Sequence, residues 1–255
     1  MKRASVIRND RGVALLIVLL ATALLVALVF EFAYAARVSL REAANFRDSR
    51  RAYFLARAGV NIFAKYGDLR ESMPHGEWTM VPMVSAGDTE LRLRWEDEAG
   101  KIRIGPGAVD AVRRDWFRQL LTETGVSQEI ADRLFGTPPV TITLISELHR
   151  VMNDEEYGRI ERYITAHSAN AVNMNTAAEA VLKSVLAGKD TQPGEILMMR
   201  QNKPIEQLPT DINNANYTTK STIFRVQSFA TVGEYTKQVD AVVVQGGAIQ
   251  YWRAR

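Results

Sequence analysis

The side chains of this sequence that could hold a metal ion are few, and most are carboxylates or amides. Asp211 and Asn213 place oxygen atoms at alternate positions, as calcium-binding loops do, but no glutamate follows at the spacing that completes such a loop. The acidic run at 154–156 is instead typical of a first helical turn, where carboxylates favour the helix dipole. Asp211 and Asn213 are therefore weak calcium candidates, and we expect no other cofactor.

Groups for covalent or acid–base catalysis are also scarce. The chain has no cysteine, which excludes a thiol nucleophile and a zinc-thiolate site. Its three histidines, His75, His149 and His167, are not at metal-ligand spacing, and no Ser-His-Asp pattern or phosphate loop accompanies them. We therefore expect that the protein is not an enzyme.

The formal charge of +3 is concentrated at one end of the sequence. The first twelve residues hold four basic side chains and one acidic side chain, and the rest of the chain is balanced. Because non-specific nucleic-acid binding depends on a net excess of basic groups, the charge distribution argues against a DNA-binding or RNA-binding surface.

An apolar helix is predicted immediately after this basic tip. Residues 13–30 contain no charge and only one polar side chain, Thr22, and after Glu31 the apolar pattern continues to Ala36. A run of this length predicts a transmembrane helix over 13–36. No glycine or proline occurs between it and Gly59, so one helix is expected from 13 to 66, with Gly67 as its stop. Its last third carries an apolar stripe for packing on a soluble domain: Phe46, Tyr53, Phe54, Val60 and Phe63.

Strand patterns occur in two separated regions. The segment 79–84 is short and apolar, and 89–104 alternates as a hairpin would, with its turn at Ala99 and Gly100 and a return strand through Ile102 and Ile104. Three further strands are predicted within 221–252, separated by turns at Gly233 and at Gly246.

The pattern between the two strand regions is helical. Helices are predicted from Val109 and from Ser127, and a third follows a capping box of Asn153 and Glu156. A second capping box of Thr176 and Glu179, and Pro193 in a first-turn position, predict two more. Each strand region alone is too small to be stable, so the sequence predicts an α+β fold in which helices interrupt one small antiparallel sheet.

The N-terminus resembles a type IV pilin-like precursor. In that family a prepilin peptidase cuts after the glycine that ends a short basic leader, and the new N-terminus is methylated. The resemblance implies cleavage between Gly12 and Val13, with N-methylation of Val13. The family usually has a glutamate at the fifth mature position, where this chain has Ile17. Among pilin-like proteins, the minor pseudopilin K of type II secretion systems typically lacks that glutamate.

Three further segments are similar to pseudopilin K. They are DEAGKIRI at 97–104, where Gly105 follows instead of the more usual asparagine, AVNMNTAAEAVLKSVLAG at 171–188, and STIFRV at 221–226. The resemblance implies a pilin-like fold, with a long N-terminal helix packed on a small antiparallel sheet and an all-helical (SAM-like) domain inserted into that sheet. The implied domains are a prepilin leader (1–12), a transmembrane segment (13–36), the first part of the pilin-like domain (37–106), the inserted domain (107–220) and the second part of the pilin-like domain (221–255).

The resemblance also implies a function and a set of partners. The protein is expected to cap the tip of a periplasmic pseudopilus, as a single-pass inner-membrane protein of a Gram-negative bacterium with its C-terminal domain in the periplasm. Its expected partners are the I, J and H minor pseudopilins, the secretion machinery and the prepilin peptidase, and no nucleic acid is expected. Two alternatives stay open: a minor pilin at a type IV pilus tip, and a membrane-anchored DNA-uptake protein that uses 171–201 as a helix-hairpin-helix module.

Overall fold

The computed structural model describes residues 10–66, 73–82, 84–105, 109–167 and 170–255. The chain divides into two compact units, residues 1–51 and 52–255, and helix α1 (Asp10–Lys65) contributes to both. The predicted leader lies mostly outside the described residues, as do the predicted helix stop at Gly67 and the predicted boundary between residues 106 and 107.

The first unit consists, in its described part, of the N-terminal three-quarters of α1. The helix contains one stretch long and apolar enough to cross a membrane, and none of that stretch is buried by other parts of the chain. The continuous helix predicted from 13 to 66 is thus confirmed to within one residue at its C-terminal end.

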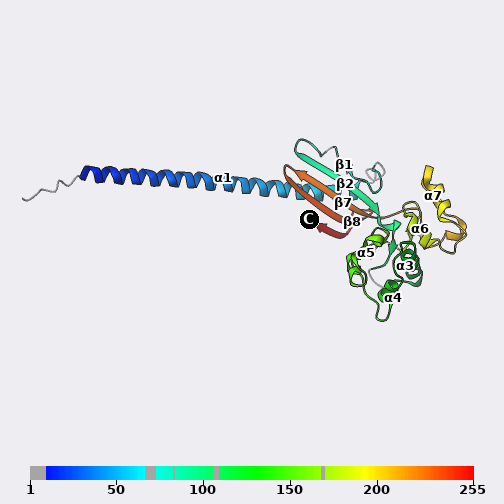
Figure 1. Cartoon of the computed structure of the whole chain (residues 1–255). Coiled ribbons are helices and arrows are strands. Elements are labelled where there is room, and N and C mark those ends of the chain that lie inside the picture. Colours follow the sequence, from blue (N-terminus) through cyan, green and yellow to red (C-terminus); the bar gives the residue numbers. More distant parts are fainter. Residues whose placement is uncertain (1–9, 67–72, 83, 106–108, 168–169) are drawn as a thin grey trace, which may run out of the picture. The chain divides into compact units, whose positions relative to one another are not determined.

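The second unit contains a five-stranded antiparallel sheet in the order β1-β2-β7-β8-β9 (Figure 1). The strands are β1 (Thr79–Met80), β2 (Thr89–Asp97), β7 (Ile223–Val232), β8 (Tyr235–Val244) and β9 (Ile249–Ala254). The three C-terminal strands and their glycine turns agree with the prediction, since Gly233, Gly246 and Gly247 all adopt positive φ angles.

Apolar and polar side chains alternate along the strands, so the sheet has two different faces. One face is apolar and packs on the C-terminal turns of α1, where Ala56, Val60 and Phe63 are buried together with Leu91 and Leu93. Small side chains permit close contact: a Cβ on Gly59 would lie only 2.8 Å from Leu93 Cδ2. The predicted stripe was wrong at Phe46 and Phe54, which are 64% and 54% exposed, because at helical spacing neither lies on the buried row of Ala52, Ala56, Val60 and Phe63.

The predicted hairpin at Ala99 and Gly100 was wrong. Strand β2 pairs along its whole length with β7, and the chain then leaves the sheet through the short 3-10 helix η1 (Glu98–Gly100). The expected return strand is instead β3 (Ile102–Arg103), which pairs in parallel with β4 (Ile164–Thr165). The Asp97 carboxylate accepts a hydrogen bond from the Ala99 N–H, and this cap turns the chain away from the sheet.

The sequence between β2 and β7 forms a mostly helical insertion with its own apolar core, centred on Phe117, Leu120, Leu134 and Leu182. Its helices are α3 (Ala111–Glu123), α4 (Glu129–Phe135), α5 (Asp154–Ile160), α6 (Glu179–Val185) and α7 (Pro193–Asn202). Its 3-10 helices are η2 (Ile145–Arg150), η3 (Glu161–Tyr163) and η4 (Thr210–Ile212). A second short parallel pair, β5 (Val172–Asn173) with β6 (Tyr217–Thr218), adds strand structure that the helical pattern did not predict.

Two of the three predicted features at helix starts are confirmed. Asn153 and Glu156 form the capping box of α5, and Pro193 occupies the first turn of α7. The capping box of Thr176 and Glu179 was wrong, because α6 begins after Ala178, which has no side chain to cap it. The Thr176 hydroxyl donates to Asp97 Oδ2 instead, at 2.6 Å. Overall, the predicted α+β fold with an interrupted sheet is confirmed.

Candidate functional site

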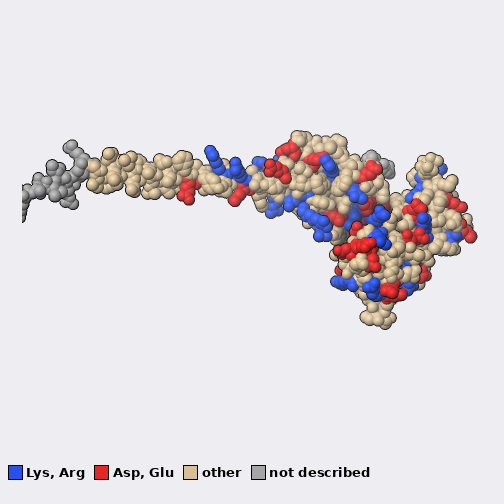
Figure 2. Space-filling model, in the orientation of Figure 1, with Lys and Arg blue, Asp and Glu red and all other residues tan. Residues whose placement is uncertain are grey.

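The residues predicted for processing all lie in α1. Gly12 and Val13 are helical, and Val13 and Ile17 are each 61% exposed. Thr22, the one polar side chain of this stretch, donates its hydroxyl to the carbonyl oxygens of Val18 and Leu19 at 2.8 and 2.9 Å. The side chains of residues 13–30 therefore present an apolar surface, and Figure 2 shows the described helix free of charged side chains until the first red side chain.

Such a surface has two chemical uses. Leaving about eighteen residues of apolar side chains in water is unfavourable by roughly 1.5–3 kcal/mol for each large side chain, so an apolar cover such as lipid or other apolar helices would stabilise this stretch. The helix can therefore serve as a membrane anchor and as a packing element. Neither use requires a catalytic group.

A second cluster lies where the insertion leaves and rejoins the sheet, and it brings the three segments of the family resemblance together. Asp97 is 3% exposed and accepts hydrogen bonds from the Asn173 side-chain amide at 2.7 Å and from the Thr176 hydroxyl. Gly100 lies so close that a Cβ there would be 3.1 Å from the Thr176 carbonyl carbon. One acidic side chain thus joins the end of β2 to the insertion.

Glu98 links the same point to β7. Its fully buried carboxylate accepts hydrogen bonds from Lys101 Nζ at 3.0 Å, from Arg225 Nε at 2.9 Å and from the Thr165 hydroxyl. Burial by itself would raise the pKa of Glu98, but the charges of Lys101 and Arg225 outweigh it and hold that pKa below its usual value. The same carboxylate holds the pKa of Arg225 above its usual value.

Each cation of this cluster has a second carboxylate partner. Lys101 Nζ also lies 2.9 Å from Glu96, and Arg225 lies 3.1 Å from Asp240 of β8. In this ion network each charged group has at least one partner of opposite charge, and the network holds the insertion on the sheet.

The Asn-Met-Asn-Thr-Ala segment is occupied with internal hydrogen bonds. Asn175 bonds to the Ile205 N–H, the Ile205 carbonyl and the Thr219 carbonyl, all within 3.0 Å. Arg200 donates to the carbonyl oxygens of Met174 and Ala177, and Lys183 pairs with Glu179. The segment acts as a brace that joins α7 to the loops at Ile205 and Thr219, and within its own turn Asn173 Oδ1 accepts a hydrogen bond from the Asn175 N–H.

One of the two calcium candidates, Asp211, belongs to a loop clamp, and the other, Asn213, is exposed. Asp211 accepts from the Thr191 N–H at 2.9 Å and from its hydroxyl at 2.5 Å, and these hydrogen bonds lower the pKa of Asp211. In the described ranges no three His, Asp or Glu side chains gather as metal ligands would. Calcium binding at Asp211 and Asn213 stays a prediction, and it would compete with the clamp for the same oxygens.

The histidines have local contacts rather than a shared site. His75 accepts from the Asp97 N–H at 3.0 Å and lies edge-on to Trp95, and burial lowers the pKa of its imidazole. His149 lies 3.1 Å from Asp154, and His167 stacks on Tyr251. The sequence analysis did not predict the cluster around Asp97 and Glu98, although three consecutive acids, Glu96, Asp97 and Glu98, at the end of an alternating strand were a signal for it.

The molecule thus combines a long N-terminal helix, apolar and exposed in its first half, with a small antiparallel sheet that an inserted domain interrupts. These features define a pilin-like α+β fold. Consistent with this class, the chain is similar to a chain in the crystal structure of the GspK-GspI-GspJ complex from the enterotoxigenic Escherichia coli type 2 secretion system. The TM-score is 0.51 at 13% sequence identity, and the match covers 86% of this chain and 99% of that chain. No family model and no curated protein sequence matches.

Proposed function

We propose that this protein is a minor pseudopilin of a type II secretion system that caps the tip of the periplasmic pseudopilus. In this role the apolar helix keeps the subunit in the inner membrane until assembly, and afterwards it packs against the helices of neighbouring subunits. The second unit lies in the periplasm of a Gram-negative bacterium. The similarity to a chain of the GspK-GspI-GspJ complex supports this proposal.

The proposal rests on the difference in exposure between the two ends of α1. Its first half is apolar and exposed, whereas Ala56, Val60 and Phe63 near its end are buried against the sheet. A signal sequence would need no such packed continuation, and the core helix of a soluble domain would not expose its apolar half. A subunit that moves from a bilayer into a helical filament needs both features.

Ile17 supports a position at the tip. In the resembling family, a glutamate at this place is thought to neutralise the terminal amine of a neighbouring subunit. A carboxylate without a partner charge is costly in an apolar surrounding, so a subunit with no neighbour beyond it is better served by an apolar side chain. The insertion between β2 and β7 enlarges the soluble unit, which also suits a subunit that ends the filament.

The first experiment examines processing of the full chain. Intact mass and N-terminal sequencing of membrane-extracted protein should show a mature chain that begins at Val13. Gly12→Val should leave the precursor uncut in the membrane, whereas the control Ala23→Val, the same kind of enlargement within the helix, should be cut normally. A mature N-terminus near Ala36, or an uncut wild-type chain, contradicts the pilin-like proposal.

The second experiment examines the partners. The detergent-solubilised chain should form a complex with the I and J minor pseudopilins in light scattering. That complex should persist at high salt, because contact through α1 is apolar. If no complex forms at any salt while the chain binds DNA in a salt-sensitive way, the DNA-uptake alternative replaces this proposal. Neighbouring genes separate type II secretion from a type IV pilus.

A further inference from the structure

The second face of the sheet is polar, and α1 does not cover it. Register places Arg94 of β2 opposite Gln227 of β7, Gln227 opposite Asp240 of β8, and Asp240 opposite Arg253 of β9. These residues form one row across four strands. Because side chains alternate along a strand, Tyr251, Arg253 and residue 255 all point to this same face.

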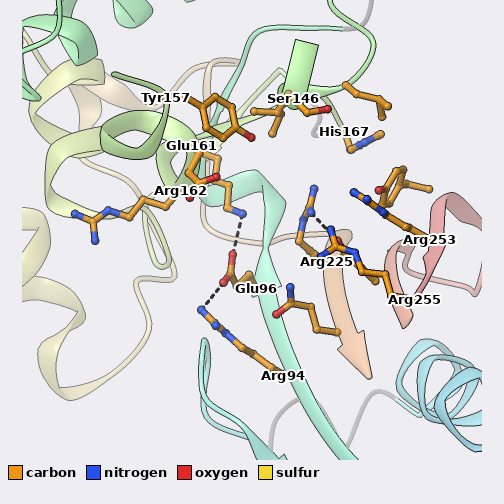
Figure 3. A pocket seen from close by; sticks show the side chains of 16 residues that line it. Arg94, Glu96, Ser146, Tyr157, Glu161, Arg162, His167, Arg225, Arg253 and Arg255 are labelled. Carbon is orange, nitrogen blue, oxygen red and sulfur yellow. Dashed lines mark hydrogen bonds and ion pairs between the residues drawn. The ribbon is translucent and has the colours of Figure 1, made fainter. Parts of the chain in front are cut away.

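A cavity of about 410 Å³ opens on this face between the sheet and the insertion. The sheet lines it with Arg225, Asp240 and Arg253. The insertion contributes Tyr157 and His167, which Figure 3 shows across from Arg225 and Arg253. All of these residues belong to the second unit. The cavity is large enough for one or two side chains of a bound segment.

Positive charge in the cavity is only partly compensated. Arg225 forms ion pairs with Glu98 and Asp240. Glu96 forms ion pairs with both Arg94 and Lys101. Figure 3 shows Arg253 and Arg255 beside Arg225, on the side away from Glu96. Both are exposed, and neither forms an ion pair with any residue of the described ranges. Arg162 of the insertion also lines the cavity without an ion pair in the described ranges, but Glu161 lines the cavity next to it. Arg253 and Arg255 therefore place the larger unpaired positive charge at the β9 end, where Arg255 acts only through space on Asp240.

The geometry at β9 fits an extended peptide better than a compact anion. Within the described residues β9 pairs only with β8, so it forms an edge to which an extended segment can add. Arg253 and Arg255 are separated by roughly 7 Å, two residues of an antiparallel strand, which matches alternate side chains of such a segment.

We propose that this pocket binds an extended acidic segment of a partner protein, which lies along β9 and places alternate carboxylates on Arg253 and Arg255. The choice of a protein as the ligand rests on the proposed function in assembly and secretion. The site itself is additional to the apolar contacts of α1. Because it depends on charge, its occupancy should fall as salt screens the arginines.

The test uses the full chain in nonionic detergent and a fluorescein-labelled, end-blocked Glu-Val-Glu-Val-Glu peptide, with binding followed by fluorescence anisotropy. The wild-type chain should bind this peptide and not its Lys-Val-Lys-Val-Lys counterpart. The double variant Arg253→Ala/Arg255→Ala should weaken binding by about tenfold or more, because two charge-assisted contacts are lost. The matched control Arg133→Ala/Arg150→Ala removes two exposed arginines of the insertion that do not line the cavity, and it should bind as the wild type does.

The outcomes separate this inference from its alternatives. Equal loss in both double variants, or no binding by the wild type, overturns the peptide site. Complete displacement of the peptide by inorganic phosphate, added at the same concentration of negative charge, also overturns the peptide site, because the pocket would then be a general anion site. Thermal unfolding of each variant shows whether the fold is retained. If the site fails while the mature chain begins at Val13 and joins the I and J pseudopilins, the proposed function stands without it.

Discussion

Removal of the Glu98 charge should destabilise the second unit far more than removal of a partly exposed carboxylate on the preceding strand β2. Glu98→Gln keeps the side-chain shape but leaves Lys101 and Arg225 without the one carboxylate that they share. Removing one partner of a buried ion pair typically costs about 3–5 kcal/mol. Each cation retains a second acid, Glu96 or Asp240, so the low end, about 3 kcal/mol, is expected.

The assay is thermal unfolding of the detergent-solubilised chain, followed by circular dichroism. For a unit of this size a loss of about 3 kcal/mol lowers Tm by roughly 6–12 °C. The control is Glu90→Gln, which breaks the 2.6 Å pair with Arg92 on the exposed part of β2. A surface pair contributes about 0–1 kcal/mol, so the control should shift Tm by a few degrees at most. Equal shifts in the two variants would refute the assignment of Glu98 as a stabilising centre.

The pH dependence of stability tests the contribution of Glu98 independently. The pKa of Glu98 is below its ordinary value of 4.5 in the folded protein, so the unfolded chain binds the proton more tightly. Its contribution to stability is therefore fully present above about pH 4.5 and is lost as the pH falls through the folded-state pKa. The wild-type chain should lose stability over this acidic range more steeply than Glu98→Gln.

Two further substitutions test the packing and the brace. Gly59→Ala should destabilise the protein by about 1–3 kcal/mol, because the new Cβ would collide with Ser228 and Leu93. In the control Gly158→Ala in α5 the new Cβ meets open space, so this variant should be more stable by about 0.4–1 kcal/mol. A Tm change of the same sign in both variants would contradict the close packing of α1. Asn175→Ala leaves three backbone groups without their partner and should cost about 2–4 kcal/mol in urea unfolding, whereas the exposed Asn213→Ala should change little.

Local patterns predicted most of the pilin-like part of this fold. The long helix follows from an unbroken run of helix-forming residues, and strands β7 to β9 follow from alternation and from glycines with positive φ. The short strands β3 to β6 have two residues each, which is below the length at which alternation can be recognised.

The candidate site could be predicted only in part, because its contacts join residues far apart in the sequence. Gly12, Val13 and Ile17 could be proposed from the sequence because a leader and an apolar run are local features, and their roles stay predictions. The bond between Arg225 and Glu98 spans 127 residues, and that between Asp97 and Thr176 spans 79. Thr176 followed by Glu179 satisfies the spacing of a capping box, and only the tertiary contact with Asp97 shows why the threonine does not cap the helix.

The position of these contacts explains how a sheet can tolerate so large an interruption. The entropic cost of closing a flexible loop rises only with the logarithm of its length. Residues 98–222 therefore add little more to this cost than a short connection would, provided that their two ends are held together. Asp97 pairs with Phe224 at the end of the β2–β7 ladder, which is the point where the chain leaves and rejoins the sheet. There Glu98 binds Arg225 across the gap, while the Asp97 side chain holds Asn173 and Thr176 of the insertion. Two consecutive acids thus fix both the closure of the sheet and the attachment of the insertion, so an insertion at this point can fold as its own core without separating the strands that it interrupts.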